Sequence, residues 1–308
     1  MRFSSFGGTL VMLLIYAVSV ASQNPYSTSL NEREAQLSVW ADSMNLGRTL
    51  SVRKAARKKF ETGLLSMLGQ EGVLDYPFDS LMHKVSILTD TLYPLKIFTW
   101  QLRKRDHREY GGCILTRDSI IPLTSDPDFT LQANRGVRGP AHWLGALYYD
   151  IVPVDVGPKG SSYLLLGLQR PNAFEKQKLI EVLRIDPRHG VRFGAPVFTK
   201  GAFDEDPADR YLLRYSSDAE ATIHYDTGYK MIVFDHLIPI GKNPAGATKW
   251  VPDGSYSAYR VALGQLVYIP KVFHMELESP PMDPSRKKQN VKLDIFGKPM
   301  KEYKKKIR

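Results

Sequence analysis

Apolar residues recur at helical spacing only in the first quarter of the chain. A stripe runs through residues 30–45, formed by Leu37, Trp40, Ala41 and Met44. A second stripe follows in residues 52–68, formed by Val52, Ala56, Phe60, Leu64 and Met67. Spacings of three and four residues place each set on one face of an amphipathic helix. We therefore expect a helical N-terminal segment over residues 23–74, folded as a hairpin.

The second predicted helix carries its charge on the face opposite the apolar stripe, at Arg53, Lys54, Arg57 and Lys58. Ser51 is a plausible N-cap, and Gly69 and Gly72 are expected to end the helix. The basic face is either solvated or offered to a partner or membrane surface.

After residue 75 the pattern changes to short runs of β-branched and aromatic residues separated by Gly, Pro, Asn and Asp. Predicted strands cover residues 85–88, 95–102, 112–116, 144–154, 163–168, 179–185, 195–198, 211–215, 221–225, 230–234, 256–262 and 265–269. Brief turns join most of them, and no helical pattern lies between them to allow parallel crossovers. We therefore predict a mainly β fold, an antiparallel meander over residues 75–279. A sandwich, a small barrel and an irregular propeller-like arrangement all fit this pattern.

Prolines fall in or beside several of these runs, at positions 94, 153, 196, 239 and 270. Proline has no N–H to donate to a ladder, so these positions are expected at strand edges, bulges or ends.

The two ends of the chain differ from the body. Residues 1–22 combine Arg2, an apolar run through residues 10–20 and small residues at Ser19 and Ala21, which is the pattern of a secretory signal peptide. The run is shorter than the roughly 20 residues that span a bilayer, so no transmembrane span is expected in the mature form. The pattern therefore predicts that the protein is exported.

The chain of 308 residues has a net charge of +10, and its 43% hydrophobic content excludes general disorder, collagen and coiled coil. Residues 286–308 contain ten Lys and Arg against two acids, a net +8, so the body is nearly neutral and nucleic-acid binding is not expected. The segment 280–308 is predicted to be a basic, disordered tail. It is either a solubilising end or a tether to an anionic surface or envelope protein.

Cys113 is the only cysteine, so the chain has no internal disulfide. Its neighbours Gly112 and Ile114 are apolar, and no catalytic thiol signature surrounds it. Cys113 is predicted to be a small buried residue.

Several β segments stand in a familiar order: residues 93–100 (YPLKIFTW), 147–151 (LYYDI), 163–167 (YLLLG), 178–183 (KLIEVL), 232–237 (IVFDHL) and 251–256 (VPDGSY). Over residues 75–270 this series resembles a group of uncharacterised exported proteins of Bacteroidota. The resemblance implies export from a Gram-negative cell and carries no reaction, ligand or catalytic residue.

The candidate chemistry in the body is a set of polar residues about one hairpin, His224, Asp226, Asp235 and His236. His224 and Asp226 share a strand face, and a turn at Gly228 would bring the other two alongside. Two imidazoles and two carboxylates suit a divalent metal such as zinc, which makes a metal-dependent hydrolase the alternative function. A hairpin end also collects Asp and His for structural reasons alone.

Aromatic residues suggest a second kind of site. His142 and Trp143 could form one wall of a pocket, with Tyr148, Tyr149 and Tyr225 as stacking surfaces for a sugar or peptide. Aromatic residues on strands more often belong to the hydrophobic core than to a binding site. The acidic run Asp204, Glu205, Asp206 and Asp209 supplies oxygen ligands but matches no EF-hand spacing, so a solvated loop is expected.

Motifs of the common enzyme classes are missing from the sequence: there is no G-x-S-x-G, H-E-x-x-H, phosphate-binding glycine loop or C-x-x-C. No cofactor is implied. The leading hypothesis is an exported, non-enzymatic binding or structural protein of the periplasm or envelope. A carbohydrate-binding module built on the tyrosines and the metal-dependent hydrolase are the alternatives.

Overall fold

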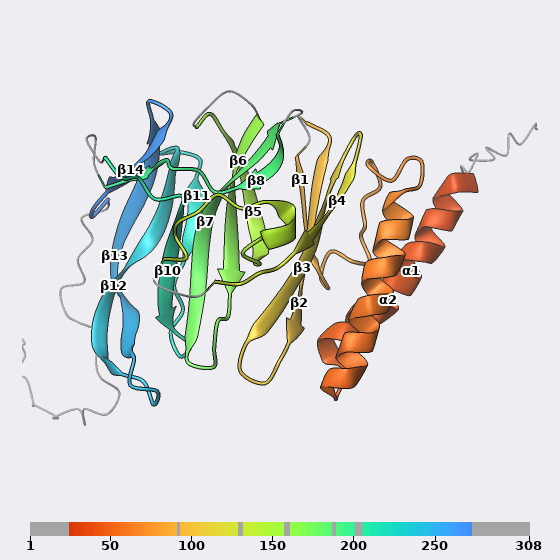
Figure 1. Ribbon diagram of the computed structural model, residues 1–308, viewed down its shortest axis with the longest axis horizontal. Helices are drawn as coiled ribbons and strands as arrows, with labels where there is room; N and C mark the ends of the chain where they lie inside the picture. The colour runs from red at the N-terminus through yellow and green to blue at the C-terminus, as the bar shows by residue number, and fades with distance from the viewer. Residues whose placement is uncertain are drawn as a thin grey trace, which may run out of the picture.

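The computed structural model describes residues 25–90, 93–128, 132–156, 161–186, 189–200 and 205–272. The predicted signal peptide and the basic tail lie outside these residues. Two helices and three β-sheets are stacked as successive layers, with the helices at one end (Figure 1). The mainly β prediction is confirmed, and of the arrangements that the sequence left open, stacked sheets correspond to the sandwich.

Helix α1 (Pro25–Leu46) and helix α2 (Leu50–Leu68) form the predicted hairpin. Helix α2 begins at a different residue from the one expected, because the Thr49 hydroxyl, and not Ser51, accepts a hydrogen bond from the Val52 N–H at 3.3 Å. Gly69 caps its C-terminus as predicted. Neither helix in the described part of the chain is long and apolar enough to cross a membrane.

The apolar stripe of α2 is rotated by one residue at its start. Val52 is half exposed, whereas Arg53 from the predicted solvated face is buried. The Arg53 guanidinium is satisfied by backbone carbonyls, since it donates to Gly47 at 2.7 Å and to Arg103 at 3.1 Å. A buried arginine is tolerated where its N–H groups are paired in this way.

The first sheet has the strand order β1 (Ser86–Asp90), β2 (Leu95–Arg103), β3 (Arg108–Thr116) and β4 (Ile120–Thr124). Side chains of β2 alternate between two cores, with Phe98, Trp100 and Leu102 facing the helices and Leu95 and Ile97 facing the second sheet. This alternation explains why the strand is apolar on both faces.

The second sheet runs β10 (Arg210–Ser216), β7 (Glu175–Asp186), β6 (Ser161–Gln169) and β5 (Leu147–Val154), with β8 (Gly190–Phe193) paired to the end of β7. It is the middle layer. Tyr163 and Leu165 of β6 pack toward the first sheet, and Leu164 and Leu166 pack toward the third. A short 3-10 helix, η1 (Pro140–His142), precedes β5.

The third sheet has the order β11 (Ile223–Asp226), β12 (Met231–Lys242), β13 (Thr248–Ala262), β14 (Gln265–Ile269) and β9 (Phe198–Thr199). Its strands are antiparallel except for the short parallel pair of β14 with β9. Strands β12 and β13 extend well beyond β11 as a long hairpin, which the sequence did not predict. Two register shifts interrupt their pairing.

Prolines follow the expected rule. Pro153 lies on β5, the edge strand of the second sheet, and Pro239 lies on the part of β12 that extends past β11 beside a register shift. Strand β4 was not predicted, because Pro122 interrupts its pattern. As the edge of the first sheet, β4 accommodates that proline.

Candidate functional site

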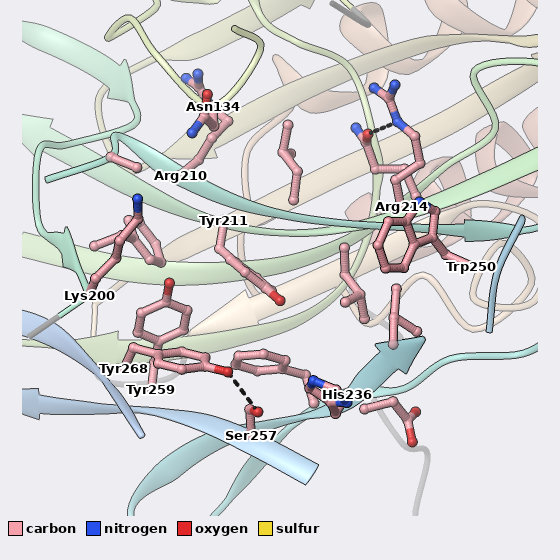
Figure 2. A pocket seen from close by; sticks show the side chains of 18 of the residues that line it. Asn134, Lys200, Arg210, Tyr211, Arg214, His236, Trp250, Ser257, Tyr259 and Tyr268 are labelled. Atoms are coloured by element: carbon pink, nitrogen blue, oxygen red, sulfur yellow. Dashed lines mark hydrogen bonds between the residues drawn. The ribbon is translucent and has the colours of Figure 1, made fainter. Parts of the chain in front are cut away.

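A cleft of about 790 Å³ lies where the edge strand β10 of the second sheet faces the third sheet. We call it the aromatic cleft, after the six rings that line it: Phe198, Tyr211, Phe234, Trp250, Tyr259 and Tyr268. Figure 2 shows four of these rings, Tyr211, Trp250, Tyr259 and Tyr268, with the polar residues around them. Ligand sites in proteins commonly have volumes of about 300 to 1,000 Å³ and mostly apolar walls.

The floor of the aromatic cleft is a continuous network of ring contacts. Tyr211 of β10 packs on Phe234 of β12 with ring centroids 4.6 Å apart and on Tyr259 of β13 at 5.2 Å. Tyr259 also contacts Tyr268 of β14 at 5.8 Å. These contacts hold the rings in fixed orientations across the two sheets, so the floor is pre-formed.

Strand alternation explains which side chains reach the floor. Residues two apart on a strand share a face, so Ser257 and Tyr259 of β13 lie on the same side, as do Leu266 and Tyr268 of β14. Ser257 and the Tyr268 hydroxyl are 2.9 Å apart and share a hydrogen bond. The apolar neighbours of each ring form the core between the second and third sheets.

The Tyr211 hydroxyl projects into the aromatic cleft (Figure 2). Burial, together with the neighbouring hydroxyls of Tyr259 and Tyr268, raises the pKa of Tyr211 well above its usual range. It therefore stays protonated at any physiological pH and can donate a hydrogen bond to a bound group.

The rim of the aromatic cleft is more polar and more exposed. Trp250, on the long part of β13, is 39% exposed, which leaves part of its indole ring open to a ligand. Asn134 lies at the other side, on the loop before β5, and its side chain makes no hydrogen bond to the described residues. Arg214 of β10 donates to the Gln177 side chain at 3.0 Å, so its guanidinium is positioned beside the opening.

Charges around the aromatic cleft largely compensate one another. Arg135 forms a bidentate pair with Asp206, at 2.7 and 2.8 Å. Arg210 donates to Glu181 in the sheet interior. Glu175 and Asp235 also line the cleft and offset the remaining lining cations, Lys200 and Arg214. The electrostatics therefore favour a neutral ligand over a strongly charged one.

Together with Asp235, His236 is a predicted site residue that lines the aromatic cleft. Its Nδ1 lies 3.0 Å from Asp253, which leaves Nε2 as the nitrogen that can meet a ligand. Burial alone would raise the pKa of Asp253, but hydrogen bonds from Ser255 and His236 outweigh it and lower the pKa below the usual range. The Asp253 carboxylate thus stays ionised and orients the imidazole.

The four residues of the predicted metal cluster do not converge. His224 is exposed on the outer face of β11, and Asp226 accepts from the Gly228 and Tyr229 N–H groups of the turn, both at 2.9 Å. Asp235 is held by Thr222, and His236 lies on the inner face. Among the described residues no group of three or more His, Cys, Asp and Glu side chains is arranged to hold a metal ion. Turn hydrogen bonds and the alternation of side chains along the strands explain the positions of these four residues.

The predicted stacking surface is also placed differently. Trp143 and Tyr148 are fully buried, and the Trp143 Nε1–H donates to the Tyr148 hydroxyl at 2.7 Å, so neither ring can meet a ligand. Tyr149 is 40% exposed, but its hydroxyl donates to the Ile223 carbonyl and Lys178 lies over its ring at 4.9 Å. His142 and Tyr225 lie outside the aromatic cleft.

The acidic run makes protein contacts in place of a cation site. Asp206 pairs with Arg135, and Asp209 accepts from the Gly136 N–H at 2.7 Å. Asp204 lies outside the described residues. These bonds fix the loop that carries Asn134 beside the cleft.

Sequence reasoning missed the cleft residues Tyr211, Tyr259, Tyr268 and Trp250. They come from three strands of two different sheets, and the three tyrosines sit in runs that are typical of core strands. The available signal was Trp250, which has no other Phe, Tyr or Trp between Phe234 and Tyr256 and lies in a segment rich in Gly, Pro, Ala and polar residues.

Searches of protein-family models, of curated proteins and of solved structures give no match for this chain. The resemblance to exported proteins of Bacteroidota therefore stays a prediction.

Proposed function

We propose that this protein is an exported binding protein that holds a neutral glycan in the aromatic cleft. The observation that carries the proposal is the combination of a pre-formed aromatic floor, Tyr211, Tyr259 and Tyr268, with the partly exposed ring of Trp250 at the rim. Sugar rings have flat C–H faces that pack on aromatic rings, and hydroxyls that need hydrogen-bond partners. The aromatic rings of the cleft would contact the C–H faces, and its polar groups would bind the hydroxyls.

Polar groups of the floor and the rim complete the match. The Tyr211 hydroxyl, the Asn134 amide, the Trp250 indole N–H and His236 offer both donors and acceptors to sugar hydroxyls. The internally paired charges give no strong preference for an anion or cation. The binding module suggested by the sequence is thus retained, but on different aromatic residues.

Export and envelope association belong to the same proposal. The apolar N-terminal run supports export, and the basic tail at residues 280–308 supports attachment to an anionic envelope surface. Chain lacking residues 286–308 is expected to leave the envelope fraction at lower salt than the intact chain. Identical fractionation across salt concentrations would contradict the tether.

A glycan array tests the ligand class directly. The purified protein should bind a subset of neutral oligosaccharides, and calorimetry should give saturable binding to the same sugars. An array without any bound glycan would overturn the proposal. Binding confined to sulfated or uronate-rich glycans would also contradict it, because such binding would follow charge and not the rings.

A further inference from the structure

A second pocket, of about 490 Å³, lies at the opposite end of the molecule, between the end of α1 and the first sheet. Its walls come from Asn45 of α1, the segment around His83 and Lys84, and the β2–β3 hairpin with Arg103 and Arg108. We call it the arginine pocket, after these two arginines. It shares no lining residue with the aromatic cleft.

The lining of the arginine pocket is rich in basic side chains. His83, Lys84, Arg103 and Arg108 line it, and none of its described lining residues is Asp or Glu. Lys84 is already paired, with Asp42 at 2.5 Å. Both acids of the β2–β3 hairpin are engaged as well, since Glu109 pairs with Lys104 at 2.6 Å and Asp106 lies 2.9 Å from the His107 ring.

Arg103 and Arg108 face each other directly. They are registered partners at the end of the β2–β3 ladder, so their side chains leave the same face of the sheet with Cβ atoms about 4.5–5.5 Å apart. Like charges in directly opposed positions destabilise a sheet. Among the described residues, the Arg108 guanidinium donates only to the His107 carbonyl, and the Arg103 side chain donates to none.

Further arginines add to this field. The Arg53 guanidinium donates to the Arg103 carbonyl, at 3.1 and 3.3 Å. Burial first, and then the charges of Arg170, Arg103 and Arg53, lower the pKa of Arg108 below its usual value. Two opposed arginine side chains without an acidic partner repel each other and destabilise the fold. An anion bound between the two guanidinium groups would remove this repulsion.

We propose that the arginine pocket binds a phosphate group between the guanidinium groups of Arg103 and Arg108. Each guanidinium presents a planar fork of N–H donors that matches the oxygens of phosphate, which is why arginine pairs recognise this group. The phosphate comes either from a free small molecule or from an anionic lipid headgroup. This site is independent of the glycan proposal, because it uses other residues on another part of the fold.

The test uses the full chain with two probes, inorganic phosphate by calorimetry and vesicles with or without phosphatidylglycerol by co-sedimentation. Saturable binding to either probe is expected, at constant ionic strength and with chloride as the reference anion. The probe that binds identifies the source of the phosphate. Arg103→Gln and Arg108→Gln should each weaken binding at least tenfold.

Arg105→Gln is the matched control, since Arg105 is an exposed arginine of the same hairpin that does not line the pocket. It removes the same charge and should change binding less than twofold. Because neither pocket guanidinium is needed for the fold, Arg103→Gln should keep or raise the melting temperature at low salt. Equal weakening by Arg105→Gln, or no saturable binding to either probe, would overturn the proposal.

Discussion

Arg210 and Glu181 face each other across strands β10 and β7 with the guanidinium Nε 2.7 Å from Oε1, and both side chains are fully buried. The second Glu181 oxygen accepts from the Tyr148 hydroxyl at 2.7 Å. The remaining Arg210 N–H groups donate to the carbonyls of Ala133 and Gly136, at 2.9 and 2.8 Å. One buried ion pair thus connects the sheet interior to the loop that brings Asn134 to the aromatic cleft.

Removing one partner of this pair should be costly. Arg210→Met is expected to lower the free energy of unfolding by about 3–5 kcal/mol, because the Glu181 carboxylate would be left buried without its counter-charge. Urea unfolding measures the change. The double variant Arg210→Met with Glu181→Leu should recover most of the loss. A single variant within about 1 kcal/mol of the parent would show that the pair is not the link described above.

Two hydroxyl side chains at the start of α2, those of Thr49 and Ser51, have different roles in the structure. Thr49→Ala should lower the free energy of unfolding by about 1 kcal/mol, because the Val52 N–H loses its cap acceptor. Ser51→Ala is the matched control and should cost less, since the Ser51 hydroxyl bonds the Thr49 hydroxyl and no helix N–H. Thermal unfolding of both variants decides between them. A larger loss for Ser51→Ala would restore the N-cap that the sequence suggested.

Cys113 is expected to be unreactive in the folded protein. Burial, with a smaller contribution from the charge of Glu61, raises the pKa of its thiol far above the usual range. The thiolate is the reactive form of cysteine. A chromogenic aromatic disulfide that reacts with thiols should therefore not label the native protein at pH 8 but should label it completely in urea. Labelling of the native protein within seconds would contradict the burial of Cys113 between α2 and the first sheet.

Alkaline pH should weaken the fold. Burial raises the pKa of Tyr110 to about 12, against an ordinary value of 10.0. Below pH 10 the hydroxyl is protonated in both states, so its contribution to stability is fully present. Between pH 10 and 12 only the unfolded chain loses the proton, so up to roughly 2–3 kcal/mol is lost.

Urea unfolding at pH 8 and pH 11 measures this loss, with Tyr110→Phe as the comparison. The variant lacks the titrating group and should lose less stability over the same interval. Parallel loss in both proteins would mean that Tyr110 does not contribute to the pH dependence.

Local patterns were sufficient for much of the fold. The stripe from Phe60 to Met67 and the apolar run 163–168 predicted a helix and a strand, because 3.6-residue spacing and two-sided burial leave a direct trace in the sequence. The long β12–β13 hairpin has no such pattern of apolar residues in the sequence. Its outer part has one neighbouring strand and is mostly exposed, so it lacks the apolar alternation of a core strand.

The candidate site was harder to predict, since it depends on which sheets face each other. Trp143 and Tyr259 are both aromatic residues within β-rich segments, yet one lies in the core behind the first sheet and the other in the floor of the aromatic cleft. Likewise, His224 and His236 lie close in sequence but on opposite faces of the third sheet. Only tertiary packing separates such pairs.

The most direct test of the proposed function compares Trp250→Ala with Tyr93→Ala in calorimetric titration with the best neutral oligosaccharide from the array. Trp250 and Tyr93 are both exposed aromatic residues, 39% and 55%, but only Trp250 lines the cleft. We predict that Trp250→Ala weakens binding at least tenfold, at unchanged thermal stability, and that Tyr93→Ala leaves the affinity within twofold of the parent protein. Equal affinities for the two variants would contradict the aromatic cleft as the binding site.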